Sequence, residues 1–318
     1  MPPWFWWTVG AAAVLTLFVV PMVLSGIIYF KILVRTSKTK WPRGCSDPND
    51  ALTAAMYAEG MSWAEAHAAE KREVTVKSGR LTLCGEYFDF GADRSVILLP
   101  GRTETLQFGY YFGELYRRAG MNVLVIDPRA HGLSDGRVNS VGFREYRDVL
   151  AWGAFLHNTC GQKSIFLHGL CIGAETAIFT LAYKKCPAYF AGAALEGIFV
   201  NFCEMTSNHF RDFGHRPFPL VYYVMVWILL CSGGWAVTDG PAKRIGRVKA
   251  PVLFLHSRED VFSKPEKSQK VFDNCLCTHR LVWFDRGRHS RLRITDTAKY
   301  DAAVLDFLSS AVYNNNNK

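Results

Sequence analysis

Apolar side chains occupy almost every position at the start of the chain, before any regular alternation with polar residues begins. No charged residue occurs in 1–30, and this run is longer than the roughly 20 apolar residues that span a bilayer as a helix. The pattern therefore predicts a transmembrane anchor over 1–35.

The two flanks of the apolar run differ in character. Aromatic residues at 4–7 form an expected interfacial belt, whereas five basic residues follow the run: Lys31, Arg35, Lys38, Lys40 and Arg43. Basic flanks tend to stay in the cytoplasm. We therefore expect a single-pass membrane protein with its N-terminus outside and the rest of the chain in the cytoplasm. A cleaved signal peptide is the alternative, but it would carry basic residues before a shorter apolar core.

A different pattern begins at about residue 72, after a polar linker at 36–60 and an Ala/Glu-rich helical segment at 61–71. Short apolar and β-branched runs now alternate with longer amphipathic stretches, and the runs lie at 73–78, 81–89, 95–100, 122–127, 164–169, 191–197, 251–257 and 281–285. The last six are almost continuously apolar, which is typical of strands covered on both faces. Helical patterns lie between them at roughly 106–119, 143–157, 172–185, 264–274 and 298–313. This alternation predicts an α/β domain over 72–318 with a mostly parallel sheet.

One interval, 197–241, interrupts the alternation of strands and helices. Its stretch 217–231 carries no charge and is bounded by prolines on one side and glycines on the other. Fifteen residues are few for a membrane span, so we expect a short apolar helical lid. A re-entrant or spanning segment is the alternative interpretation.

Composition and charge narrow the class of protein. The 318 residues are 49% hydrophobic and carry a net charge of +9. Attraction to anionic lipid headgroups explains this surplus, and no P-loop, zinc-finger spacing or aromatic-basic motif points to nucleic acid. The nine cysteines follow no framework spacing, which favours reduced thiols. The tail 314–318 is expected to be disordered.

The stretch HGLCIGA at 168–174 has the form of a nucleophile elbow. It joins a buried-type strand to a helix, and Gly169 and Gly173 flank Cys171 at the spacing G-x-C-x-G. Small residues at both positions allow a sharp turn that presents the central side chain at an accessible point. The helix N-terminus favours a thiolate there, so the position suits a nucleophile.

A nucleophile of this kind needs a base and an orienting carboxylate. Asp260 follows the run LFLHS and His289 lies in the loop after LVWFD. We expect the nucleophile, acid and histidine to follow three successive late strands and to meet at the carboxyl edge of the sheet.

These motifs together resemble the α/β-hydrolase superfamily over roughly 72–312. DPRAHGLSDG at 127–136 matches the segment D-x-R-x-H-G-x-S-x-G that follows the fourth strand in this superfamily. LLPGRTETLQFGYYFGELYRRAG at 98–120 is similar to the lysophospholipase and monoacylglycerol lipase branch, which is related to serine aminopeptidase-type hydrolases. The resemblance implies that Cys171 is the nucleophile, His289 the general base and Asp260 its orienting acid. It also implies that the backbone N–H groups of Ile172 and Arg102 form the oxyanion hole.

Cysteine in place of serine at 171 is the departure from the pattern of the superfamily. Some members, such as dienelactone hydrolases, use a Cys-His-Asp triad, so hydrolysis remains open. The thiolate is also a good leaving group, which puts efficiency on oxygen esters in doubt. The alternatives for Cys171 are a binding-only pseudo-hydrolase site and a redox thiol.

Several other polar residues have competing interpretations. Glu196 is an alternative orienting acid, and Arg102 could bind a polar headgroup or form a structural ion pair. His131 and Ser134 are expected to be structural loop residues. The cluster Cys275, Cys277 and His279 lacks the usual zinc spacing, so neither a metal nor a cofactor is expected.

The sequence as a whole predicts a membrane-anchored hydrolase with the α/β-hydrolase fold. Its expected substrates are carboxylic esters or thioesters with an apolar acyl group, such as a lysophospholipid or monoacylglycerol, and its expected contacts are this substrate and the bilayer. The alternatives are an inactive pseudo-hydrolase that binds a lipid or protein, and a peptidase of the same fold.

Overall fold

A computed structural model describes residues 1–37 and 39–315 of the chain. Eight strands are present: β1 Lys71–Ser78, β2 Leu81–Phe88, β3 Arg94–Leu99, β4 Asn122–Ile126, β5 Ser164–Leu170, β6 Phe190–Glu196, β7 Val252–Ser257 and β8 His279–Phe284. They coincide with the eight apolar runs of the sequence to within about two residues at most ends. The last three residues of the expected disordered tail lie outside the described residues, and the first two end a helix.

The eight strands form one sheet in the order β1-β2-β4-β3-β5-β6-β7-β8. The pairs β1–β2 and β2–β4 are antiparallel, and every other pair is parallel. The mostly parallel sheet expected from the alternation of strands and helices is therefore confirmed. Because the six strands β3 to β8 run parallel, their carboxyl ends share one edge, where ligands bind in sheets of this kind.

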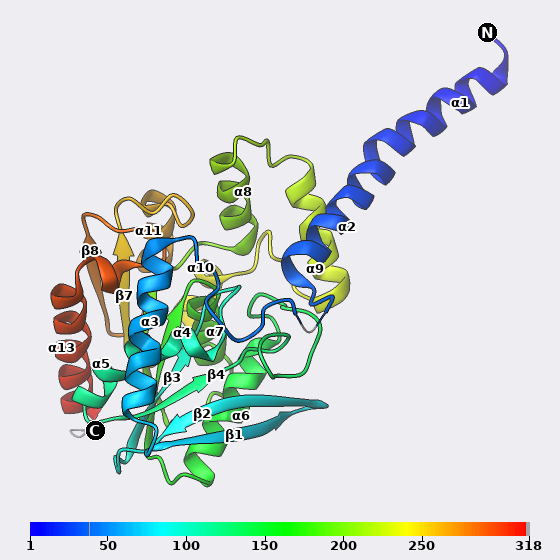
Figure 1. Cartoon of the computed structure of the whole chain (residues 1–318). Helices are drawn as coiled ribbons and strands as arrows, with labels where there is room; N and C mark the ends of the chain where they lie inside the picture. The colour runs from blue at the N-terminus through cyan, green and yellow to red at the C-terminus, as the bar shows by residue number, and fades with distance from the viewer. Residues whose placement is uncertain (38, 316–318) are drawn as a thin grey trace.

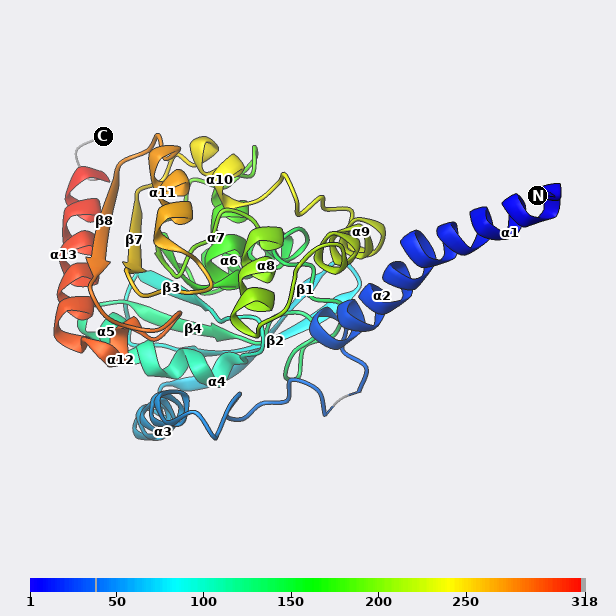
Figure 2. The same ribbon diagram turned by 90° about the horizontal axis from the view of Figure 1, so that it is seen from above.

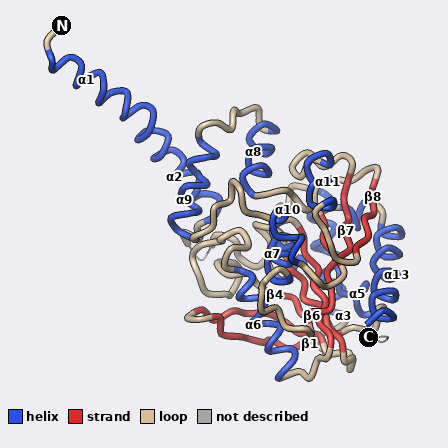
Figure 3. Tube along the Cα trace, turned by 180° about the vertical axis from the view of Figure 1, so that it is seen from behind, coloured by secondary structure: helices blue, strands red, loops and turns tan. Residues whose placement is uncertain are grey.

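Helices cover both faces of this sheet, as Figures 1 and 3 show. The described helical segments of the domain are α3 Ala51–Ala66, α4 Leu106–Gly109, η2 Tyr110–Phe112, α5 Gly113–Arg118, α6 Glu145–Asn158, α7 Ile172–Leu181, α8 Phe202–Asp212, α9 Leu220–Ser232, α10 Pro241–Arg244, η3 Ile245–Arg247, α11 Pro265–Asp273, α12 Leu292–Thr295 and α13 Thr297–Asn315. Residues of α6, α7, α10 and α11 join the core on one face. Residues of α3, α4, α5, α12 and α13 join the core on the other.

The helix expected at 61–71 is longer and earlier than the sequence predicts. It begins at Ala51 and ends at Ala66, and the side chain of Asp50 caps it by accepting a hydrogen bond from the N–H of Leu52 at 3.2 Å. Part of the segment interpreted as a linker is therefore helical. Trp63 and Met56 bury the inner face of α3 against β2 and the α4–α5 segment, and this tertiary packing was not visible in the local composition.

The N-terminal apolar run is helical from Pro3 to Leu33, as α1 Pro3–Val14, η1 Leu15–Val19 and α2 Val20–Leu33. It has 31 residues and contains an 18-residue window with a mean hydropathy of 2.4, so its length and composition are sufficient to cross a membrane. Its first half extends away from the domain, and its second half lies beside α9 (Figures 1 and 2).

The lid helix α9 packs directly on α2. The ring of Trp227 stacks on Tyr29 at 6.2 Å and its Nε1–H donates to the carbonyl of Met22 at 3.1 Å. Gly26 permits this approach, because a Cβ there would lie 3.1 Å from the Trp227 ring. At 13 residues α9 is too short to span a bilayer, and it lies within the segment that the sequence predicts to be a lid.

We expect Trp152→Ala to lower the stability of the domain by about 3–5 kcal/mol, because Trp152 is fully buried between α6 and the sheet and its removal leaves a large cavity. Thermal unfolding of the detergent-solubilised protein measures this change. Leu133→Ala is the matched control, since Leu133 is 62% exposed and should change little. Equal melting temperatures for the two variants would contradict the packing described here.

Candidate active site

Cys171 sits at the turn between β5 and α7, in a backbone conformation that L-residues seldom adopt. Its φ and ψ are 53° and −113°, and such strain is typical of functional turns. The turn is tight because a Cβ on Gly173 would lie 2.0 Å from the carbonyl oxygen of Leu99, and one on Gly169 would lie 2.5 Å from the backbone N of Ala174. The two glycines of the motif therefore allow α7 to begin directly against the end of β3.

His289 and Asp260 come together at the same edge of the sheet. Nδ1 of His289 lies 2.7 Å from Oδ2 of Asp260, and the other oxygen of Asp260 accepts from the N–H groups of Phe262 and Ser263 at 2.9 and 2.7 Å. These bonds fix the carboxylate and leave one oxygen for the imidazole. The contact also defines the tautomer, because a hydrogen on Nδ1 leaves Nε2 available.

The free nitrogen of His289 is placed toward the thiol. Nε2 is buried and has no hydrogen-bond partner among the described residues. Burial works to lower the pKa of His289, but the charge of Asp260, followed by that of Cys171, raises this pKa well above its usual value. Burial conversely works to raise the pKa of Asp260, and His289 holds it below its usual value. The arrangement can store a proton on the imidazole beside a thiol.

The three residues do not follow three successive strands. Cys171 follows β5, Asp260 follows β7 and His289 follows β8, and β6 lies between β5 and β7. The sequence suggested otherwise because β6, which lies between β5 and β7, carries none of the three residues and was left out of the count.

The site is closed in this structure, whereas the elbow motif suggested an accessible side chain. Cys171 is only 9% exposed. One apolar cluster covers it, with members from α2, the 138–143 loop, α8 and α9: Tyr29, Leu33, Val141, Phe202, Val221, Val224, Met225 and Ile228. Sequence reasoning missed the contribution of Tyr29 and Leu33, because their place in an apolar run was explained completely by a membrane span.

The two expected oxyanion-hole residues belong to segments that meet at the elbow. Ile172 is the first residue of α7, and Arg102 lies in the loop after β3, against which Gly173 packs. Over the described ranges, neither backbone N–H has an acceptor in the structure. Donors of this kind stabilise developing negative charge by about 3–4 kcal/mol each.

The side chain of Arg102 forms no ion pair with a carboxylate in the described part of the chain, which corrects one of the two interpretations made from the sequence. Its Nη1 instead donates to the carbonyl of Ile32 at the end of α2, at 3.1 Å. The carbonyl of Arg102 lies 2.6 Å from Nε2 of His131, whose ring stacks on Trp41 at 4.5 Å. The loop that carries Arg102 is therefore held from two sides.

Among the described residues, the carboxylate of Glu196 forms no hydrogen bond with His289. Its carboxylate accepts from the N–H of Leu292 at 2.9 Å and from the hydroxyl of Tyr300 at 2.8 Å, and its carbonyl accepts from the N–H of Cys171 at 3.0 Å. It therefore links the elbow to the segment that follows His289. Sequence reasoning missed this role, and the only available signal was the position of Glu196 at the end of a buried strand.

The remaining candidates bond mainly to backbone groups. The hydroxyl of Ser134 donates to the carbonyl of Asp127 at 2.7 Å, which fits a structural role in the loop. Nδ1 of His279 lies 2.9 Å from the carbonyl of Cys277. Cys277 and His279 lie at the start of β8, at the sheet edge opposite to Cys171.

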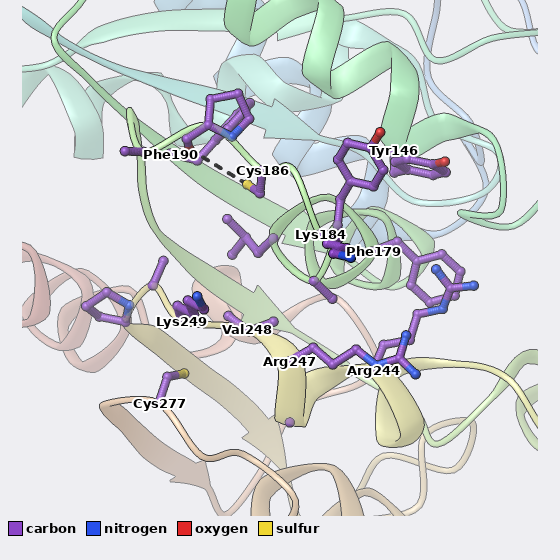
Figure 4. Close-up of a pocket in the computed structure, with 18 of the residues that line it drawn as sticks. Tyr146, Phe179, Lys184, Cys186, Phe190, Arg244, Arg247, Val248, Lys249 and Cys277 are labelled. Carbon is purple, nitrogen blue, oxygen red and sulfur yellow. Dashed lines mark hydrogen bonds between the residues drawn. The ribbon is translucent and has the colours of Figure 1, made fainter.

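A cavity of about 1290 Å³ lies elsewhere, at the amino ends of β6 and β7 (Figure 4). Its lining includes Tyr146, Phe179, Lys184, Arg247 and Lys249. Because Cys171 lies at the opposite edge of the sheet, this cavity is separate from the candidate active site.

The chain is similar in sequence to two known proteins. The chain is 25% identical over 218 residues to the uncharacterised protein YqkD of Bacillus subtilis, covering 68% of this chain and 71% of that protein. It is 24% identical over 196 residues to the protein bem46 of Schizosaccharomyces pombe, covering 61% of this chain and 60% of that protein. No family model matches the chain.

Among solved structures, the esterase PF2001 of Pyrococcus furiosus is similar, with a TM-score of 0.66 and 24% identity over 78% of this chain and 93% of that one. The α/β hydrolase GrgF of a Penicillium species gives a TM-score of 0.59 and 17% identity over 76% and 98%. An α/β hydrolase of Vibrio vulnificus gives 0.57 and 17% over 85% and 99%. The chain has the α/β-hydrolase fold.

We expect Asp260→Asn to lower the pKa of His289, because burial works to lower this pKa and the charge of Asp260 is the largest effect that raises it. The imidazole of the variant should therefore lose its proton at a lower pH than the imidazole of the parent protein. Titration of the His289 ring signals by NMR measures the change. Asp285→Asn, at a side chain that is 86% exposed, is the control. The same titration of His289 in Asp260→Asn and in the parent protein would show that Asp260 does not act on the imidazole.

Proposed function

We propose that this protein is a membrane-anchored hydrolase that cleaves carboxylic esters or thioesters of lipid-like substrates through Cys171, His289 and Asp260. The observation that carries the proposal is the 2.7 Å contact between Nδ1 of His289 and Asp260, with Nε2 unpaired and the thiol near enough to influence the imidazole. A pocket that only binds a ligand would not require a histidine held between a carboxylate and a thiol.

The proposed reaction has two acyl-transfer steps. Nε2 of His289 takes the thiol proton, and Sγ of Cys171 attacks the carbonyl carbon while the N–H groups of Ile172 and Arg102 receive the oxyanion. The leaving alcohol or thiol departs with the proton from His289, and a thioester remains on Cys171. Water then gives a proton to His289 and attacks the thioester. The product acid leaves and the thiol regains its proton.

Two features support a lipid-like substrate. The cluster that covers Cys171 is apolar and combines the lid with the end of α2. The outer side of the lid also exposes apolar residues beside the anchor: Phe218, Tyr222, Leu229 and Leu230. An apolar surface in this place fits a bilayer interface, where monoacylglycerols and lysophospholipids are dissolved.

Substitution of the thiol tests the chemistry. Cys171→Ala should lower esterase turnover on p-nitrophenyl butyrate by at least about a thousandfold, whereas Cys171→Ser should retain measurable turnover, because the base and the oxyanion donors remain. Cys45→Ala, at a partly buried cysteine in the linker, should match the parent protein.

Each result of this experiment separates the candidate functions. Full activity in Cys171→Ala would reject Cys171 as the nucleophile. Absence of turnover by the parent protein on esters, thioesters and peptide amides alike would favour a binding-only pseudo-hydrolase. Turnover on amides alone would favour a peptidase.

The lid gives a separate prediction about the bilayer. Leu230→Asp places a charge where the lid is expected to meet lipid, and Leu230 is 66% exposed. Turnover on monoacylglycerol in vesicles should fall about tenfold relative to turnover on soluble p-nitrophenyl butyrate. Leu276→Asp, at an 81% exposed residue away from the lid, should leave this ratio unchanged. An equal ratio for both variants would show that the lid does not touch lipid.

A further inference from the structure

Arg102 lies beside the candidate nucleophile and uses little of its hydrogen-bonding capacity. Its only hydrogen bond from the side chain to a described residue is the 3.1 Å contact from Nη1 to the carbonyl of Ile32. A guanidinium has five N–H donors arranged to receive two oxygens of a carboxylate or phosphate. Four donors of Arg102 therefore remain free of protein partners.

The tight elbow brings the loop that carries Arg102 close to the start of α7. The loop after β3 passes so close to α7 that a Cβ on Gly173 would lie 2.8 Å from the carbonyl oxygen of Pro100, two residues before Arg102. Burial lowers the pKa of Arg102, and Cys171 acts on it in the opposite direction. The guanidinium and the thiol are thus within electrostatic reach of one another.

The basic side chains of Lys40 and His209 lie near Arg102, and neither supplies a counter-ion. Burial and then Arg102 lower the pKa of Lys40, whose Nζ donates to the carbonyl of Phe30 at 2.9 Å. His209 of the lid helix α8 also feels Arg102, after burial and other groups, and its pKa falls to about 4. No carboxylate of the described residues lies within ion-pair distance of Arg102. A carboxylate or phosphate bound there would pair with the free donors of the guanidinium.

A purely structural role accounts for only part of this arrangement. Arg102 and Lys40 both donate to carbonyls in the last turn of α2, where cations are favourable. Capping one carbonyl, however, uses only one donor of Arg102. It does not require the side chain to lie near the thiol. An exposed lysine would serve the helix end equally well.

We propose that the guanidinium of Arg102 binds an anionic group, a carboxylate or a phosphate, that the substrate carries close to its scissile acyl bond. This subsite rests on the proposed function and narrows the substrate to an acyl ester or thioester with a negative charge near the carbonyl carbon. The charge could belong to the acyl part, as in a dicarboxylic acid, or to the headgroup, as in a lysophospholipid.

The first experiment needs no turnover. The protein is alkylated with iodoacetate and with iodoacetamide, which differ mainly in charge, and the ratio of rates at Cys171 is measured by peptide mass spectrometry. In Arg102→Gln the ratio of iodoacetate to iodoacetamide should fall about tenfold, because a charge-assisted hydrogen bond is lost. Arg102→Lys should recover part of the ratio. Arg258→Gln, at a side chain that is 57% exposed, should leave it unchanged.

Loss of packing alone would change both reagents together and would not move the ratio. Melting temperatures of the variants verify that they are folded. An equal ratio in the parent protein and in folded Arg102→Gln would overturn the proposal, and so would failure of both reagents to reach Cys171 in the parent protein.

The second experiment identifies the source of the charge. The value of kcat/KM is measured for two pairs that each contain a charged and a neutral ester: p-nitrophenyl succinate with p-nitrophenyl butyrate, and lysophosphatidate with monoacylglycerol. The parent protein should prefer the charged member of one pair, and Arg102→Gln should reduce that preference about tenfold. A preference confined to the first pair assigns the charge to the acyl part, and one confined to the second assigns it to the headgroup.

The outcomes distinguish the subsite from the proposed function. Hydrolysis of both pairs with the same preference in the parent protein and in Arg102→Gln rejects the subsite and leaves the hydrolase in place. Hydrolysis of neither pair counts against the proposed function, and the alkylation ratio still decides whether Arg102 attracts anions to the thiol.

Discussion

The close approach of α7 to the end of β3 is the constraint on which the candidate site depends. Because Gly173 has no side chain, the first turn of α7 lies against the carbonyl of Leu99. This contact determines the strained backbone conformation of Cys171 and the direction of the N–H of Ile172. It also determines how far these two residues lie from the loop that carries Arg102. The methyl group of an alanine at position 173 would push α7 away from the end of β3. The geometry of the site therefore requires glycine at this position.

The strands and the main features of the elbow were predictable because both are local in sequence. A buried parallel strand is a short apolar run, and a tight strand-to-helix turn needs glycines at fixed spacing, so each of them is recorded in a few adjacent residues. The pairing of His289 with Asp260 was also within reach, since both follow strands whose carboxyl ends share one edge. The α/β-hydrolase fold expected from these motifs is confirmed.

Contacts between distant segments were not predictable. The start of α3 at Ala51 was missed because 36–60 was interpreted as one polar linker, although its last ten residues are Ala-rich. Met56 and Trp63 pack this helix on the sheet and the α4–α5 segment. The closure of the site by Tyr29 and Leu33 was hidden for another reason. The apolar run that contains Tyr29 and Leu33 is suited both to cross a membrane and to cover Cys171. Either role alone explains its apolar composition. The bond from Arg102 to Ile32 joins residues 70 positions apart, so the sequence left an ion pair as an equal alternative.

The end of α2 is attached to the hydrolase domain by main-chain bonds rather than by a flexible tether. The N–H of Arg35 donates to the carbonyl of Arg137 at 2.6 Å, and the N–H of Asn139 donates to the carbonyl of Leu33 at 2.8 Å. Under the proposed function, an enzyme held in a bilayer by such a joint would not swing toward a neighbouring membrane or into the aqueous phase. Its rate would then depend on how many substrate molecules occupy each unit of area in its own leaflet. Dilution of the surrounding solution would leave that surface density, and hence the rate, almost untouched.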